Sequence, residues 1–228
     1  MKKVVSAVPR AVMFDFDGTL VDSAPDLAGA INDVRAERGL PAMPYAELRP
    51  YATYGARSLL RAGLNLLPDA TAYEATRQRF LAIYEERKLR NTHLFDGVLE
   101  LLIALERQHI SWGIVTNKHS RLAEPMIHEL LRDRAFNPAA VVCGDTTPTP
   151  KPHPAPLLLA ARHAGMEPEH CWFVGDGESD VRASVAAGMK SVLATYGYVP
   201  DLAHARSWGA HHEIDQPLDL LELVTPAA

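Results

Sequence analysis

The chain has 228 residues, of which 47% are hydrophobic and 22% charged, and its formal net charge is −5. This length suits one large core, or a core with a small inserted domain, and the composition argues against disorder. The acidic balance and the lack of a Lys or Arg run give no support for a nucleic-acid surface. No window approaches 18 apolar residues, so we expect no membrane span.

The start of the chain and its two cysteines indicate where the protein works. Residues 1–10 contain two lysines and lack the long apolar stretch of a secretory signal peptide. Cys143 and Cys171 each lie in a strand-like apolar run, which favours buried free thiols over a disulfide. We therefore predict a soluble cytoplasmic protein.

The first predicted element is a buried strand at Ala11–Phe14, which leads directly into Asp15 and Asp17. Two residues apart on an extended chain, these carboxylates project to the same side. They can hold one divalent cation while one of them attacks an electrophile. Gly18 follows in a flexible backbone whose N–H groups suit a phosphate. Taken alone, the short Asp-x-Asp-Gly motif is also compatible with an ordinary turn after a strand.

Residues 22–92 contain no comparable buried strand. About 70 residues between the first two core strands is far more than a crossover helix requires. Helical spacing is plain near both ends of this segment, at Leu27-Ile31-Val34 and Phe80-Leu81-Tyr84. We predict an all-helical second domain here. Ligands of open α/β sheets lie beyond the carboxyl ends of the strands, so this domain would close over the two carboxylates.

From residue 95 onward, apolar strands alternate with segments of helix length, which predicts an α/β fold with a Rossmann-like parallel sheet covered on both faces. The core would comprise residues 1–21 and 93–228, and the helical domain residues 22–92. The predicted strands after the first are Ile110–Val115, Ala139–Cys143, Cys171–Val174 and Ser191–Ala194. The predicted helices are Val98–Gln108, Leu122–Leu131, Pro154–Ala164 and Asp180–Ala187.

Glycine and proline mark the ends of these helices. Gly165 and Gly188 lie where helix C-caps belong. Pro125 and Pro154 are tolerated only in a first turn, which predicts that each lies near the start of its helix.

Two of the segments that follow core strands carry groups able to bind phosphate. Thr116 and Asn117 end the second core strand with a hydroxyl and an amide, although such pairs usually serve turns. Lys151 lies between two prolines that stiffen its loop, although a lone lysine is usually solvated.

A third segment, after the fourth strand, is acidic. It contains Asp176, Glu178 and Asp180. Carboxylates here can bind a metal, and they can equally cap the helix that begins there.

Taken in order, these segments resemble the four motifs of the haloacid dehalogenase superfamily of phosphatases: DxDGT, a Thr or Ser after the second strand, a loop lysine, and GDxxxD. The resemblance covers the chain from Val12 to about Leu223. A helical insert between the first and second motifs is similar to the C1 cap domain of that family.

The resemblance implies a reaction through Asp15 and Asp17. Asp15 would be the nucleophile that forms an aspartyl-phosphate, and Asp17 would protonate the leaving alcohol and then deprotonate water. Mg²⁺ would be held by the Asp15 carboxylate, the Asp17 backbone carbonyl and Asp176, with Asp180 supporting these ligands through hydrogen bonds.

The same resemblance assigns the phosphate contacts. Thr116, Lys151 and the Gly18 N–H would face the phosphate oxygens, and the Asn117 amide is a further candidate. Lys151 would also offset repulsion between an anionic nucleophile and a dianionic substrate.

The residues also discriminate between activities within the superfamily. A dehalogenase lacks an acid at the position of Asp17, and a phosphonatase needs a cap lysine, for which the insert offers only Lys88. A phosphatase is favoured. A sugar phosphomutase of the β-phosphoglucomutase type shares every core motif and stays the alternative. A non-catalytic ligand-binding domain is disfavoured, because the chain has all four of the core residues that catalysis requires: Asp15, Asp17, Lys151 and Asp176.

The identity of the phosphate ester depends on the insert. Arg57, next to a glycine-containing turn, can pair with a substrate carboxylate or lie on a solvated helix face. Several core segments resemble the phosphoglycolate phosphatase group, and within it the N-acetylmuramic acid 6-phosphate phosphatase branch. These segments include Trp112–Lys118, Ala123–Met126, Thr195–Tyr198 and Trp208–Ala210. We expect a small phosphate ester as substrate and a monomer or homodimer. Glu178 would either shift the metal preference or be solvated.

Overall fold

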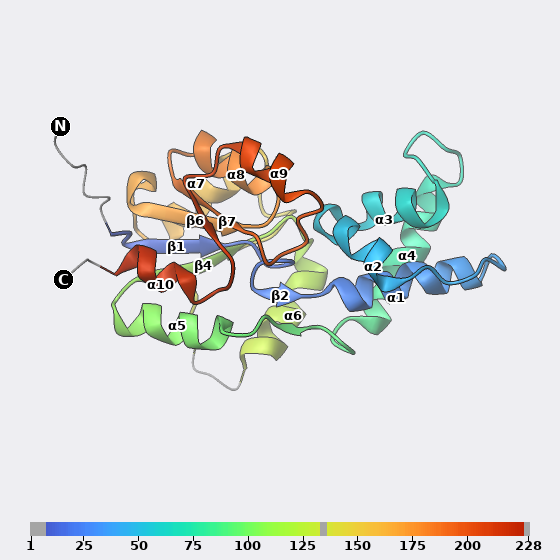
Figure 1. Ribbon diagram of the computed structural model, residues 1–228, viewed down its shortest axis with the longest axis horizontal. Helices are drawn as coiled ribbons and strands as arrows, with labels where there is room; N and C mark the ends of the chain where they lie inside the picture. Colours follow the sequence, from blue (N-terminus) through green and yellow to red (C-terminus); the bar gives the residue numbers. More distant parts are fainter. Residues whose placement is uncertain (1–7, 133–135, 226–228) are drawn as a thin grey trace.

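The computed structural model describes residues 8–132 and 136–225 (Figure 1). The predicted outer limits of the core, residues 1 and 228, and most of the lysine-containing start lie outside the described residues. Six parallel strands form one sheet in the order β5-β4-β1-β6-β7-β8, which confirms the predicted α/β fold. Their bounds are β1 Ala11–Phe14, β4 Ser111–Val115, β5 Ala140–Val142, β6 Cys171–Gly175, β7 Lys190–Ala194 and β8 His212–Ile214.

Helices cover both faces of this sheet (Figure 1). Along β1, Val12 and Phe14 pack into one apolar cluster, and Ala11 and Met13 pack into another on the opposite face. This alternation follows from the pleat of a strand. The first face carries α5 Val98–Arg107, α6 Ser120–Leu131 and α10 Asp219–Val224, and the second carries α7 Ala155–His163 and α8 Glu178–Ala186. The short elements η2 Pro168–His170, α9 Leu202–Ala205 and η3 Arg206–Trp208 lie in the connections.

The helix ends agree with the sequence prediction at the glycines and differ at one proline. Gly165 and Gly188 follow α7 and α8 with φ of +66° and +75°, as a glycine C-cap requires. Helix α6 begins at Ser120, so the prediction that Pro125 lies in its first turn is wrong. The reason is a long-range contact. The Asp145 carboxylate accepts hydrogen bonds from Ser120 N at 2.8 Å and Ser120 Oγ at 2.7 Å, which starts the helix earlier.

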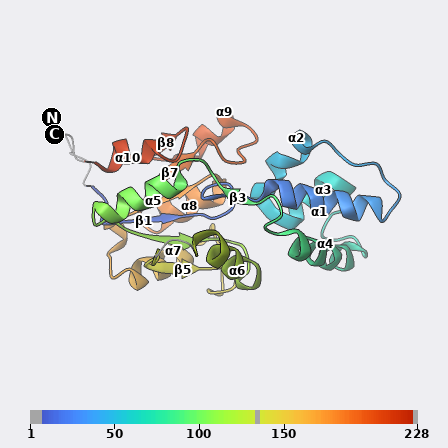
Figure 2. The same ribbon diagram turned by 90° about the horizontal axis from the view of Figure 1, so that it is seen from below.

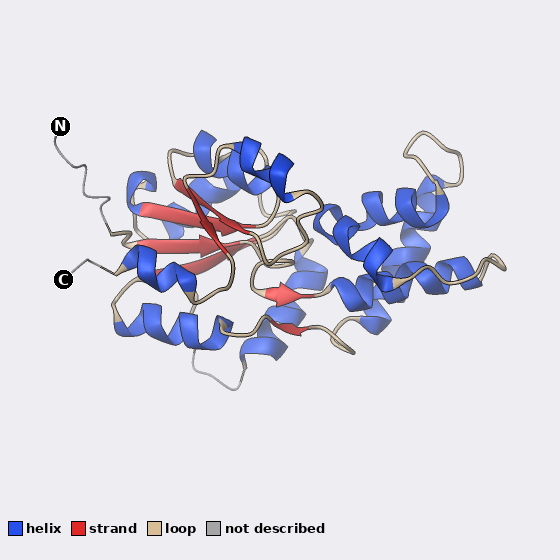
Figure 3. Ribbon diagram, viewed as in Figure 1, coloured by secondary structure: helices blue, strands red, loops and turns tan. Residues whose placement is uncertain are grey.

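Between β1 and the rest of the sheet, the chain builds a group of helices with its own apolar cluster. The chain leaves the core for these helices through β2 Val21–Asp22 and returns to the core through β3 His93–Leu94. These two short strands pair antiparallel. Figures 2 and 3 show this group of helices beyond one end of the sheet, and Figure 2 labels β3 between the two. Its elements are α1 Ala24–Ala36, α2 Tyr45–Leu48, η1 Arg49–Tyr54, α3 Gly55–Leu64 and α4 Tyr73–Arg87.

Two further predictions can be compared with the structure. Cys143 and Cys171 are buried free thiols, as predicted. Among the described residues, none of the helices is long and apolar enough to cross a membrane.

Candidate active site

The predicted site residues follow three neighbouring strands. Asp15, Thr116 and Asp176 come directly after β1, β4 and β6, which are adjacent in the order β4-β1-β6. The backbone continues the sheet at this edge, because Asp15 N donates to the Val174 carbonyl at 2.8 Å. Parallel strands end together, so residues that are 60 or more positions apart in sequence meet here.

Lys151 is the central cation of this edge. Its Nζ lies 2.9 Å from Asp15 Oδ1 and 2.8 Å from Asp180 Oδ1, and it donates to the Val115 carbonyl at 2.7 Å. The side chain is 1% exposed. Burial lowers the pKa of Lys151, but the two carboxylates outweigh burial and raise it, so the ammonium stays charged. The structure therefore places the predicted loop lysine beside Asp15.

Asp15, Asp176 and Asp180 form a cluster in which one oxygen of each lies within 4.8 Å of the others. Asp180 Oδ2 accepts from Gly177 N at 2.9 Å, while its Oδ1 faces Lys151. Asp176 is fully buried, and its Oδ1 has no hydrogen-bond partner. A buried carboxylate oxygen without a partner is costly, and a bound cation would satisfy it. Three oxygen donors of this kind fit a hard divalent ion such as Mg²⁺.

The pKa values of Asp15 and Asp176 are both raised in this cluster. Burial raises the pKa of Asp15 to about 7, although the Lys151 ammonium opposes the rise. Burial, reinforced by the charges of Asp15 and Asp180, also raises the pKa of Asp176 well above its usual range. A cation between these carboxylates would favour their ionised forms.

Two glycines give the Asp176 carboxylate its space. Gly18 has φ of +85°, and a Cβ there would lie 2.3 Å from Asp176 Oδ2. A Cβ on Gly197 would lie 2.3 Å from Asp176 Cβ. The glycine of the first motif is therefore required both by its left-handed backbone and by the close approach of the buried Asp176 carboxylate.

Asp17 contacts Lys118, a residue that sequence reasoning missed. Lys118 Nζ donates to Asp17 Oδ1 and Oδ2 at 2.9 and 3.0 Å, and to Tyr84 Oη at 2.8 Å. Ser23 Oγ also donates to Asp17 Oδ1. Lys118 directly follows Thr116 and Asn117 in the sequence, but nothing in that pattern indicates that its ammonium is buried against Asp17.

Two of the predicted phosphate contacts have other partners. Gly18 N donates to the Val21 carbonyl at 2.9 Å, so the prediction of a free N–H there is wrong for this structure. The Asn117 amide donates to the Lys151 carbonyl at 2.9 Å and accepts from Lys151 N at 3.0 Å. Both polar atoms of the Asn117 amide thus hold the Lys151 backbone, and phosphate binding by Asn117 stays a prediction. Thr116 is buried, and its Oγ1 accepts from Lys118 N at 3.1 Å.

The helical insert touches the site through η1, which sequence reasoning did not single out. Thr53 Oγ1 donates to Asp176 Oδ2 at 3.2 Å. Arg49 donates to the Gly197 and Tyr196 carbonyls at 2.9 and 3.2 Å. By contrast, Arg57 is exposed on α3.

Glu178 stands outside the carboxylate cluster. It lies at the start of α8, with its side chain 43% exposed, and faces Arg182 at 3.6 Å. The structure thus favours the solvated alternative for this residue.

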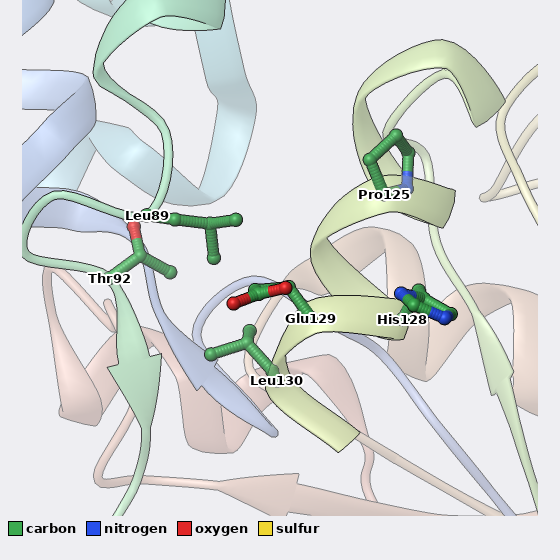
Figure 4. Close-up of a pocket in the computed structure, with 6 residues that line it drawn as sticks. All are labelled: Leu89, Thr92, Pro125, His128, Glu129 and Leu130. Carbon is green, nitrogen blue, oxygen red and sulfur yellow. The ribbon is translucent and has the colours of Figure 1, made fainter. Parts of the chain in front are cut away.

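A separate groove of about 700 Å³ lies between residues 88–92, which link α4 to β3, and α6 (Figure 4). None of the residues that line it belongs to the carboxylate or lysine set. They are Leu89, Thr92, Pro125, His128, Glu129 and Leu130.

Comparison with known proteins places this geometry in a family context. The model of a family described as haloacid dehalogenase-like hydrolase matches residues 12–194. A phosphoglycolate phosphatase of Xanthomonas campestris is 44% identical over 220 residues, which covers 96% of this chain and 97% of that protein. An N-acetylmuramic acid 6-phosphate phosphatase of Pseudomonas putida is 37% identical over 219 residues, which covers 96% and 97%. The crystal structure of a predicted phosphoglycolate phosphatase from Haemophilus somnus superposes with a TM-score of 0.80 at 28% identity, covering 95% of this chain and 98% of that one.

Proposed function

This chain belongs to the haloacid dehalogenase-like hydrolase family and is a phosphatase, and we propose that it hydrolyses a small phosphate monoester through an aspartyl-phosphate on Asp15 with the aid of Mg²⁺. The observation that carries the proposal is the buried cluster in which Asp15 faces Lys151 and Asp176 keeps one oxygen without a partner.

In this proposal, a carboxylate oxygen of Asp15 attacks phosphorus and the bond to the leaving alcohol breaks. Lys151, 2.9 Å from Asp15, offsets the repulsion between the carboxylate and the phosphate dianion. The Asn117 amide holds the Lys151 backbone on both sides, so the ammonium is presented at a defined place. The Thr116 hydroxyl is a further donor to the phosphate oxygens.

Asp17 supplies and removes the protons. It would protonate the alcohol oxygen as that bond breaks, and then take a proton from the water that hydrolyses the aspartyl-phosphate. Contacts with Lys118 and Ser23 hold its carboxylate in place.

Mg²⁺ would be held by the Asp15 and Asp176 carboxylates and the Asp17 backbone carbonyl, with Asp180 supporting them. When bound, the ion supplies electrostatic stabilisation of the transferring phosphoryl group. The charge balance supports a divalent ion, because Asp15, Asp17, Asp176 and Asp180 carry a formal −4 while Lys151 and Lys118 carry +2.

We propose residues 22–92 as a cap domain that selects the alcohol. Its Thr53 reaches Asp176, so the insert lies against the site and encloses whatever the phosphate carries. Phosphoglycolate and N-acetylmuramic acid 6-phosphate are the leading substrates, since relatives named for both match almost the whole chain. Arg57 stays a proposed carboxylate contact.

A substrate panel tests this function. We expect Mg²⁺-dependent release of phosphate from phosphoglycolate, N-acetylmuramic acid 6-phosphate or a sugar phosphate, with a preference of at least about tenfold in kcat/KM for one of them. Asp15→Asn should abolish turnover while the fold and stability persist. Full activity of Asp15→Asn, or no Mg²⁺-dependent turnover of any ester by the folded protein, would refute the proposal.

The compartment and assembly follow as secondary proposals. The buried free thiols Cys143 and Cys171 suit a reducing cytoplasm. Light scattering after gel filtration would distinguish the monomer from the homodimer.

A further inference from the structure

We propose that Lys118 is a positioning residue for Asp17, and that Tyr84 ties this lysine to the helical insert. The inference deepens the proposed function and rests on it, because it assigns Asp17 the proton transfers. Neither Lys118 nor Tyr84 is needed to bind the metal or the phosphate in that mechanism.

The three donors of the Lys118 ammonium account for its orientation. Two point at the two Asp17 oxygens, at 2.9 and 3.0 Å, and the third points at Tyr84 Oη, at 2.8 Å. The side chain is 7% exposed, against 18% for Asp17. Contact with both oxygens fixes the plane of the carboxylate, which a single contact would leave free to turn.

Lys118 and Asp17 form a largely buried ion pair in which the two charges compensate each other. Burial lowers the pKa of Lys118, but the charge of Asp17 and the contact with Tyr84 outweigh burial and raise it. An ammonium so placed stays charged, and removing it would leave Asp17 part-buried beside the other acids. Lys118 therefore serves Asp17 as Lys151 serves Asp15, although Lys151 also pairs with Asp180.

Tyr84 carries this contact into the insert. It is 1% exposed on α4 and stacks on Phe80 of the same helix, with ring centroids 6.4 Å apart. Its ring also lies 4.7 Å below the Lys118 ammonium, and its hydroxyl donates to Met126 Sδ of α6 at 3.7 Å. A shift of α4 away from the sheet would break the contacts of Tyr84 with Lys118 and Met126 together. The position of α4 thereby affects the anchoring of Asp17.

Leaving groups separate a positioning role from a structural one. An alkyl phosphate needs a proton on its departing oxygen, whereas p-nitrophenyl phosphate releases a stable anion. Because kcat/KM reports events through departure of the leaving group, misplacing Asp17 should affect only the alkyl ester. A general loss of structure would lower kcat/KM for both.

The experiment compares Lys118→Met, Lys118→Arg and Tyr84→Phe, with Lys88→Met as the control. Among the described residues, the Lys88 ammonium donates only to the Glu85 carbonyl of its own segment. For Lys118→Met we expect kcat/KM to fall about 100-fold with the preferred alkyl ester and less than about threefold with p-nitrophenyl phosphate. Lys118→Arg should restore part of the loss. Tyr84→Phe keeps the ring and should show the same selective loss at about three- to tenfold.

Equal losses with both esters, or no loss with the alkyl ester, would overturn the inference. Tyr84→Phe removes a single hydroxyl, so this variant tests the positioning role if Lys118→Met does not fold. If the proposed function itself is wrong, the wild-type protein will turn over neither ester with Mg²⁺, which distinguishes that outcome from a failure of the inference about Lys118.

Discussion

The carboxylate of Asp26 joins α1, the first helix of the insert, to the segment that leads from α4 back to β3. Its removal should destabilise the protein strongly. Asp26 is fully buried in the first turn of α1. It accepts hydrogen bonds from Asn91 N and Nδ2 at 3.0 Å each, and from Thr92 N and Oγ1 at 3.0 and 2.8 Å. Four donors on one carboxylate clamp the linker that leads back to the sheet.

The magnitude follows from which donors would be left without water. Asn91 is exposed, so its groups can hydrogen-bond to solvent in Asp26→Ala. Thr92 is 7% exposed, so both its donors would lose their partner in a buried place. At about 1.5–3 kcal/mol for each bond to a charged group, the two give a loss of about 4 kcal/mol. For a chain of this size that corresponds to a fall in Tm of about 12 °C.

Urea denaturation measures the loss, with Asp69→Ala on an exposed loop as the control. Thr92→Val should cost about 1–2 kcal/mol in the wild-type background and much less beside Asp26→Ala, because the hydroxyl then has no acceptor to lose. A free energy of unfolding for Asp26→Ala within about 1 kcal/mol of the wild type would refute the reasoning.

Three other predictions concern the site and the thiols. Gly18→Ala should abolish the thermal stabilisation by Mg²⁺, because its Cβ would lie 2.3 Å from Asp176 Oδ2; an unchanged Mg²⁺-induced rise in Tm would contradict this. Burial raises the pKa of Cys143 and of Cys171 to about 11 from the unfolded value of 9.0, so stability present below pH 9 should fall as the pH rises through 11. Native protein should also resist thiol labelling at pH 8 and react at both cysteines in urea, and rapid native labelling would argue against burial as the cause. Arg57→Ala should raise KM for a carboxylate-bearing ester and leave p-nitrophenyl phosphate unaffected; equal effects on both would remove Arg57 from substrate recognition.

The parts of the fold that were predictable are those with long or distinctive patterns. The continuous apolar run of β1 can only be buried on both faces, and glycines after α7 and α8 provide the left-handed caps that those helices need. Strands β2 and β3 have two residues each, too few for any periodicity to appear. Strand β8, His212–Ile214, is three residues long and carries two polar side chains, so it gives no buried-strand signal either.

The sequence alone is enough to bring Asp15, Thr116 and Asp176 together, because each stands directly after a strand and parallel strands end at one edge. Lys151 joins them from the loop after β5. Tertiary structure alone decided the rest. The Asn117 amide holds the Lys151 backbone, and Lys118 is the partner of Asp17. The Lys118 contacts depend on α4, whose Tyr84 lies 34 positions away and reaches the site only after the insert has packed against the core.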